Sequence, residues 1–314
     1  MTTPHGPRPT TTHRAASRRT VLTLGATGLA TAATAAGTAP IASAASATVG
    51  HGRGRLDRAL GALEHETGVR VGVVAGRGAR SEYAWRGGEA FPMCSLFKAL
   101  VVGQLLRDHA DDDAFWARGI RFTAADVVVN SPICAADPDR MMTVAELADA
   151  ALRYSDNTAG NLLLDLVGGP PAVGRYARTF GAIRTRLDRR EPELNEATPG
   201  DPRDSSTPAD IHRLYGSLLL GDALSVLGQA RLRSWMLRNT SAGERIGKVL
   251  PAGAELADKT GAGGYGVVND AGAIWSGGAS MTLVIMTRTD DVDAVWNNTV
   301  VQRAARLLIE AFLR

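Results

Sequence analysis

The pattern of apolar and polar residues divides the chain into ends that favour strands and a middle that favours helices. Strand-like alternation occurs in segments separated by glycine-rich turns, at residues 69–75, 81–85, 256–260, 266–275 and 281–287. Helical spacing covers residues 56–63, most of 91–229, and 300–313. This order predicts an α+β fold, with an antiparallel β-sheet built from both termini and flanked by helices, plus an inserted all-helical subdomain.

One predicted helix has no polar face. Residues 96–106 are almost wholly apolar, so this helix is expected to be buried on all sides. Ser95 and Lys98 interrupt the pattern at positions i and i+3, on the same side of the helix. Two interpretations are open. Either Ser95 caps the helix while Lys98 reaches solvent, or the lysine amine activates the serine hydroxyl as a nucleophile.

Lysine usage favours the second interpretation. Of the 35 Lys and Arg residues, only three are lysines: Lys98, Lys248 and Lys259. Arginine cannot give up its proton in a protein, whereas a lysine removed from water can. A lysine kept inside an apolar helix of an arginine-rich chain is therefore expected to act through its titratable amine.

The first 47 residues differ from the rest of the chain. They hold four arginines, no lysine and no acidic residue, and Arg18 and Arg19 precede an apolar stretch that ends in small-residue sites near Ala47. This order is typical of a twin-arginine signal peptide, so we expect residues 1–47 to direct export. No later apolar stretch is long enough to span a bilayer, which predicts a secreted protein without a membrane anchor.

Charge and composition argue against nucleic acid binding, a metal site and a disulfide. Loss of the signal's four arginines leaves 31 basic and 32 acidic residues, so the formal charge changes from +3 to −1 and gives no case for nucleic acid binding. The histidines show no metal-ligand spacing, and we expect no metal or other cofactor. Cys94 and Cys134 could pair after export, but Cys94 abuts Ser95 on a buried helix, which favours two free thiols.

Three further polar clusters follow in the chain. They are Ser155-Asp156-Asn157, then Glu191-Pro192-Glu193-Leu194-Asn195, then Lys259-Thr260-Gly261. Taken singly, they have ordinary explanations as a turn or cap, a solvated loop acid and an edge-strand charge. The second cluster, however, lies in a long irregular span over 184–208, and loops of this length inside compact domains are usually functional. We therefore interpret the clusters and Ser95 as one site.

The combination resembles a known family. Ser95-x-x-Lys98, Ser155-Asp156-Asn157 and Lys259-Thr260-Gly261 match the motif set of class A β-lactamases and penicillin-binding proteins. The resemblance covers essentially the whole chain after the signal, and the loop with Glu191 and Asn195 favours class A. It implies a β-lactamase domain over 48–314, with an α/β part at 48–90 and 230–314. The helical part covers 91–229 and carries an omega loop at 186–204.

The resemblance also implies roles for these residues. Ser95 would attack the lactam carbonyl, and Lys98, or Glu191 through a water, would take its proton. Ser155 would pass a proton to the departing nitrogen, and Glu191 would activate the water that hydrolyses the acyl-enzyme. The residues implied in substrate binding are Asn157, Asn195, Lys259, Thr260, Gly261, Ala262 and Arg245, with the backbone N–H groups of Ser95 and Ala262 as the oxyanion hole. An Arg189–Asp204 ion pair would brace the omega loop.

Three positions depart from the family pattern. Ala262 stands where many members have Ser or Thr, Asn130 where an aromatic wall is common, and Arg190 where an apolar or aromatic residue is usual. The expected function is hydrolysis of penicillins and cephalosporins by an exported monomer. The alternatives are a D-alanyl-D-alanine peptidase, and a β-lactam-binding protein that acylates without turnover.

Overall fold

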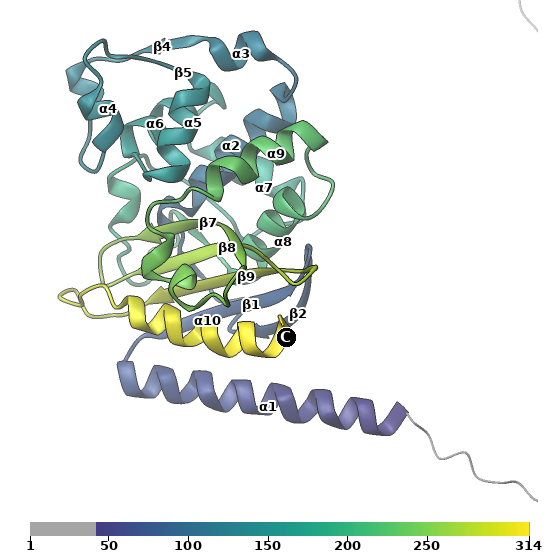
Figure 1. Cartoon of the computed structure of the whole chain (residues 1–314). Helices are drawn as coiled ribbons and strands as arrows, with labels where there is room; N and C mark the ends of the chain where they lie inside the picture. Colours follow the sequence, from purple (N-terminus) through teal and green to yellow (C-terminus); the bar gives the residue numbers. More distant parts are fainter. Residues whose placement is uncertain (1–41, 314) are drawn as a thin grey trace, which may run out of the picture. The chain divides into compact units, whose positions relative to one another are not determined.

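Five antiparallel strands form the central sheet of the computed structural model (Figure 1). The structure describes the backbone of residues 42–313 and the side chains of 52–313, so most of the expected signal lies outside the described residues. The strand order is β2-β1-β9-β8-β7. Their bounds are β1 Arg70–Arg77, β2 Arg80–Trp85, β7 Glu255–Ala262, β8 Val268–Ser276 and β9 Ala279–Arg288. Strands from both ends of the chain thus pair in one sheet, which confirms the predicted fold class.

Helices cover both faces of this sheet. On one face pack α10 (Asn298–Phe312) and the part of α1 (Ala42–Thr67) that begins at Leu56, and the apolar side chains of Leu60 and Ile274 share one core cluster. On the other face lies α8 (Pro208–Leu219), whose Gly216 sits so close to β1 and β2 that an added Cβ would come within 2.3 Å of the Gly78 carbonyl oxygen. Burial on both faces explains why nearly all residues of β1, β8 and β9 are buried.

The helical subdomain is organised around α2 (Phe97–His109), which is buried on every side as the sequence predicts. The other helices of this subdomain are α3 (Asp113–Ala117), α4 (Pro132–Ala136), α5 (Val144–Arg153), α6 (Asn157–Leu166), α7 (Pro171–Arg178) and α9 (Val226–Met236). Two small ribbons complete it, β3 (Phe91–Pro92) with β6 (Ser205–Ser206) and β4 (Gly119–Arg121) with β5 (Met141–Thr143). Short 3₁₀ turns are η1 (Cys94–Leu96), η2 (Ala124–Asp126), η3 (Glu193–Asn195), η4 (Ala242–Glu244) and η5 (Ile246–Val249).

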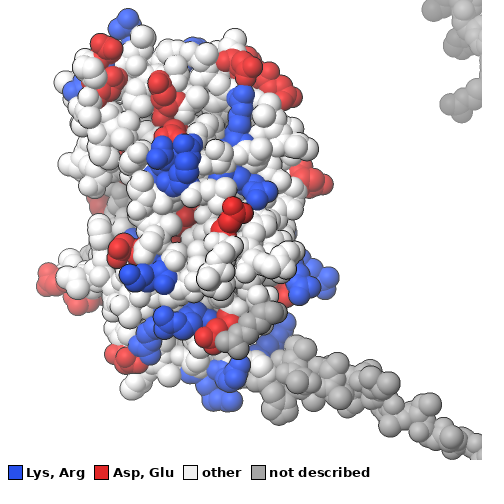
Figure 2. Space-filling view, viewed as in Figure 1, with Lys and Arg blue, Asp and Glu red and all other residues white. Residues whose placement is uncertain are grey.

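The local details differ from the prediction at two helix starts. Ser95 lies in the turn η1 ahead of α2 and not on the helix itself. Just before this turn, Pro92 pairs with Ser205 in a short ribbon. The first helix begins well before residue 56 and continues to Thr67. No helix in the described part of the chain has the length and apolar character that a membrane crossing requires. On the face drawn in Figure 2, basic and acidic side chains are interspersed.

Candidate active site

Ser95 is presented by a strained turn. The preceding residue, Cys94, has a φ of 48°, a left-handed conformation that a side chain rarely adopts. The Cys94 side chain is fully buried and packs with Ala197 and Val267, which holds the turn in place. Cys94 and Cys134 are free thiols, as expected. Backbone strain of this kind is typical of functional positions, where surrounding contacts over-determine the conformation.

Lys98 is buried and surrounded by hydrogen-bond acceptors. Its Nζ donates to Ser95 Oγ at 2.9 Å, to the Ser155 carbonyl oxygen at 2.7 Å and to Asn157 Oδ1 at 2.7 Å. Glu191 Oε1 lies 3.0 Å from the same nitrogen. A buried amine is tolerated only when it is paired and hydrogen-bonded in this way, and here every partner belongs to a predicted site residue.

Glu191 faces the nucleophile from the omega loop. The Ser95 hydroxyl donates to Glu191 Oε1 at 3.2 Å, and Asn195 Nδ2 donates to the other carboxylate oxygen. The Glu191 backbone is clamped by Asn161, whose amide donates to its carbonyl oxygen at 2.9 Å and accepts from its N–H at 3.0 Å. Sequence reasoning missed Asn161. Its spacing in the sequence could have indicated this role, because Asn161 stands four positions after Asn157 and so lies on the same side of α6.

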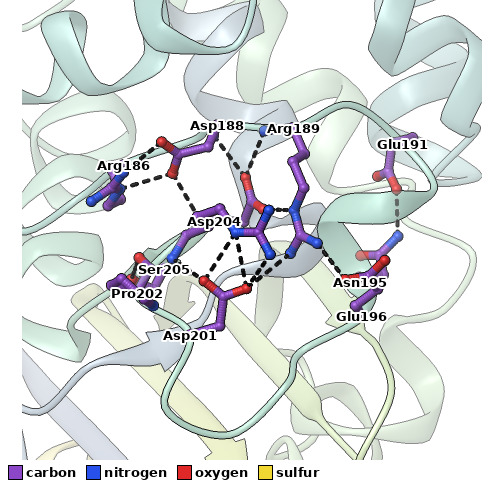
Figure 3. Close-up of polar contacts among 11 residues, drawn as sticks. Arg186, Asp188, Arg189, Glu191, Asn195, Glu196, Asp201, Pro202, Asp204 and Ser205 are labelled. Carbon is purple, nitrogen blue, oxygen red and sulfur yellow. Dashed lines mark hydrogen bonds and ion pairs between the residues drawn. The ribbon is translucent and has the colours of Figure 1, made fainter.

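Charge pairs brace the omega loop at its base (Figure 3). Asp204 is buried and pairs with Arg189 at 2.6 Å, and its other oxygen accepts from the backbone N–H groups of Asp188 and Arg189. Arg190, one of the departures from the family pattern, turns toward α6 and pairs with Asp165. The loop that carries Glu191 is therefore held at both of its sides.

Ser155 bridges the two lysines of the site. Its own φ of 57° places it in the left-handed region, and its Oγ accepts from Lys259 Nζ at 3.0 Å and from Lys98 Nζ at 3.4 Å. Burial, followed by the nearby charge of Lys98, lowers the pKa of Lys259 to about 7. Lys259 is therefore an ammonium group that can lose its proton near neutral pH.

A pair of carboxyl groups lies beneath Lys259. Asp258 and Asp270 are both fully buried, and burial raises the pKa of each. The nearby charge of Asp270 raises the pKa of Asp258 further, so Asp258 is the member of the pair that more readily keeps a proton. Asn239 Nδ2 donates to Asp258 Oδ2 at 3.0 Å and fixes its orientation.

Arg245 is a buried cation at the β7 side of the site. Its Nη1 donates to the carbonyl oxygens of Gly261 at 2.7 Å and Asn269 at 2.6 Å, and its Nε donates to Asn298 Oδ1 at 3.0 Å. Burial lowers its pKa from the usual value. The guanidinium therefore has a fixed position beside the end of β7, where an anionic group could be held.

All of the predicted site residues lie around one cleft. The cavity measures about 1010 Å³, and its lining comes from both the sheet and the helical subdomain. Its lining includes Ser95, Ser155, Asn157, Asn195, Arg245, Thr260, Gly261 and Ala262. Lys98, Glu191 and Lys259 lie behind this lining and reach it through their hydrogen bonds. Within the described residues, no group of three or more His, Cys, Asp or Glu side chains could hold a metal ion.

Comparison with known proteins agrees with this arrangement. A family model described as the β-lactamase enzyme family matches residues 55–312. A β-lactamase of Streptomyces fradiae is 45% identical over 302 residues, which cover 94% of this chain and 96% of the relative. The structure of the Streptomyces albus G β-lactamase superposes with a TM-score of 0.78 at 43% identity, covering 82% of this chain and 99% of that one.

An ancestral class A β-lactamase gives a TM-score of 0.77 at 43% identity, covering 82% of this chain and 100% of the other. The chain therefore belongs to the β-lactamase enzyme family. Within that family it is a hydrolase of class A.

Proposed function

We propose that this enzyme opens the lactam ring of penicillins and cephalosporins through an acyl-enzyme on Ser95. The observation that carries the proposal is the contact of the Ser95 hydroxyl with two buried groups that can accept its proton. Lys98 Nζ lies 2.9 Å from Ser95 Oγ, and Glu191 Oε1 lies 3.2 Å from it. A hydroxyl in contact with a general base is the usual arrangement for an activated nucleophile.

Acylation uses the helical side and the sheet side of the cleft together. Ser95 Oγ attacks the lactam carbonyl carbon while its proton passes to Lys98 or toward Glu191. The developing oxyanion is received by the backbone N–H groups of Ser95 and Ala262. The ring C–N bond then breaks, and Ser155 delivers a proton to the departing nitrogen. The bonds from Lys98 and Lys259 to the Ser155 hydroxyl support that role.

Deacylation depends on the omega loop. A water held between Glu191 and Asn195 loses a proton to the Glu191 carboxylate and attacks the ester carbon. The bond between that carbon and Ser95 Oγ then breaks, and the proton returns from Glu191 to the serine oxygen. Two observations support this assignment. Asn195 Nδ2 donates to Glu191, and Asn195 Oδ1 is buried without a protein partner among the described residues. A buried acceptor of this kind favours a bound water.

Basic side chains and the edge strand β7 would bind the substrate. Lys259, Thr260 and Arg245 would receive the substrate carboxylate, and Asn157 would bind the amide of the acyl substituent. The Thr260 hydroxyl is held by Ser241 at 2.7 Å, which supports a fixed hydrogen-bond partner at this point. We further propose that residues 1–47 are a twin-arginine signal that directs secretion. We also propose that the mature enzyme is a monomer.

The test is the intact mass of the mature protein mixed with benzylpenicillin, measured beside the rate of ring opening. Catalytic ring opening that is lost in Ser95→Gly is the expected result. A stable adduct on Ser95 without turnover would instead indicate a β-lactam-binding protein. Ring opening slower than cleavage of a D-alanyl-D-alanine peptide would indicate the peptidase.

A further inference from the structure

Two exposed aromatic side chains stand at the mouth of the cleft. Among the Trp, Tyr and Phe residues of the described chain, only Tyr154 and Trp296 are more than a third exposed, at 36% and 60%. Both line the same cavity as Ser95. An isolated exposed apolar residue needs no explanation, but two aromatic rings gathered on one substrate cleft do.

Trp296 is held in place from its polar end. It lies in the segment between β9 and α10, and its indole N–H donates to the Gly263 carbonyl oxygen at 2.8 Å. Two residues later, Asn298 accepts from Arg245. The same short segment therefore fixes both the indole ring and the guanidinium. A ring anchored by its N–H and exposed over its apolar surface is arranged to contact a ligand.

The position of Gly263 directly after β7 indicates which part of the substrate meets this ring. The proposed carboxylate partner Thr260 comes first along β7, the Ala262 N–H of the oxyanion hole follows, and Gly263 lies just beyond it. In a β-lactam the carboxylate and the acylamino substituent project from opposite ends of the fused rings. A substrate with its carboxylate at Thr260 therefore extends its acyl substituent past Ala262 and toward Gly263.

The strand end itself cannot supply an apolar wall there. A Cβ at Gly263 would lie 2.7 Å from the Asn195 carbonyl oxygen and 2.9 Å from Cys94 Sγ. A Cβ at Gly264 would lie 2.6 Å from the Glu196 carbonyl oxygen. Both positions are thus restricted to glycine, and an apolar surface beside them has to come from another segment. Trp296 provides it.

We propose that Trp296 is a specificity-determining residue that stacks on aromatic acyl substituents of β-lactams. This inference rests on the proposed function. Trp296 supplies an aromatic ring in a cavity whose lining has Asn130 at the position where the family commonly has an aromatic wall. The preferred substrates are therefore penicillins and cephalosporins whose acyl group carries a phenyl or heteroaromatic ring.

The experiment compares two penicillins that share the amide and differ in the ring: benzylpenicillin and 6-acetamidopenicillanic acid. In Trp296→Ala, kcat/KM for benzylpenicillin should fall about fivefold through KM, as expected for loss of an aromatic stack. For the acetamido compound it should stay within about twofold of wild type. Trp296→Phe should recover most of the loss. Val295→Ala, at a neighbouring position that is 83% exposed, is the matched control and should change neither value.

Equal losses on both penicillins would overturn the inference, because they would show that the indole only positions the end of β7. An unchanged kcat/KM for benzylpenicillin in Trp296→Ala would overturn it as well. A failure of the proposed function can be distinguished from these results, because the wild-type enzyme would then open the lactam ring of neither penicillin. The inference would then be wrong as well.

Discussion

Lys98 Nζ and Glu191 Oε1 lie 3.0 Å apart, and both side chains are completely buried. The hydroxyl of Ser95 contacts both groups, so the nucleophile stands between the two side chains that could take its proton. Removing one partner would leave the other charge buried and unpaired, at a large cost in stability. Informative substitutions therefore keep a polar side chain at each position, and the roles of the two groups can be distinguished by the reaction step that each substitution slows.

Glu191→Gln should trap the acyl-enzyme. The amide keeps the shape of the side chain but cannot take a proton from water, so deacylation should slow by about 100-fold or more while acylation continues. Stopped-flow ring opening should show a burst, and intact mass should show an adduct on Ser95. Glu193→Gln, on the exposed side of the same loop, is the control and should turn over normally. Unchanged turnover in Glu191→Gln would contradict the water-activating role.

Lys98→Arg should affect the earlier step. The guanidinium keeps the positive charge but cannot act as a base, so the acylation rate should fall by about 100-fold or more. The measurement is the single-turnover rate of adduct formation with benzylpenicillin. Lys248→Arg makes the same change at an exposed position and should have no effect. Near-native acylation in Lys98→Arg would show that Glu191 alone is sufficient as the base.

The sequence predicted the parts of this site that depend on local pattern. The apolar run around Lys98 indicated a buried helix, and alternation indicated the sheet from both termini, because each follows from the period of its own segment. Asn161 and Trp296 were not found, since their roles depend on contacts between distant segments. Trp296 meets Gly263 across 33 residues, and that contact exists only once β7, β8 and β9 have paired in register.

The pKa of Lys259, about 7, predicts a pH effect on substrate capture. The side chain is cationic below that pH and neutral above it, so attraction for the substrate carboxylate should weaken as the pH rises. The value of kcat/KM for benzylpenicillin should fall along an alkaline limb that begins near pH 7. In Lys259→Arg the charge persists, and this limb should move to higher pH even if the absolute rate is lower. An identical alkaline limb in both enzymes would assign the titration to another group, and Lys248→Arg is the matched control.

The buried pair of Asp258 and Asp270 should make stability depend on pH. The raised pKa of Asp258 means that the folded protein keeps a proton that the unfolded chain has already released. Above the ordinary pKa of an aspartate, the unfolding free energy should therefore decrease as the pH rises, by up to about 1.4 kcal/mol per pH unit for each proton, until the folded pKa is passed.

Asp258→Asn should remove this contribution, because an amide can donate to Asp270 as the protonated carboxyl does but has no proton to lose. Denaturant unfolding between about pH 5 and 9 should show a smaller decrease in stability for Asp258→Asn than for wild type. Asp222→Asn, a change at an exposed position, should keep the wild-type slope. Equal slopes in wild type and Asp258→Asn would mean that Asp258 is already ionised in the folded protein. The proton assigned to the Asp258–Asp270 pair would then have to be absent or bound to another group.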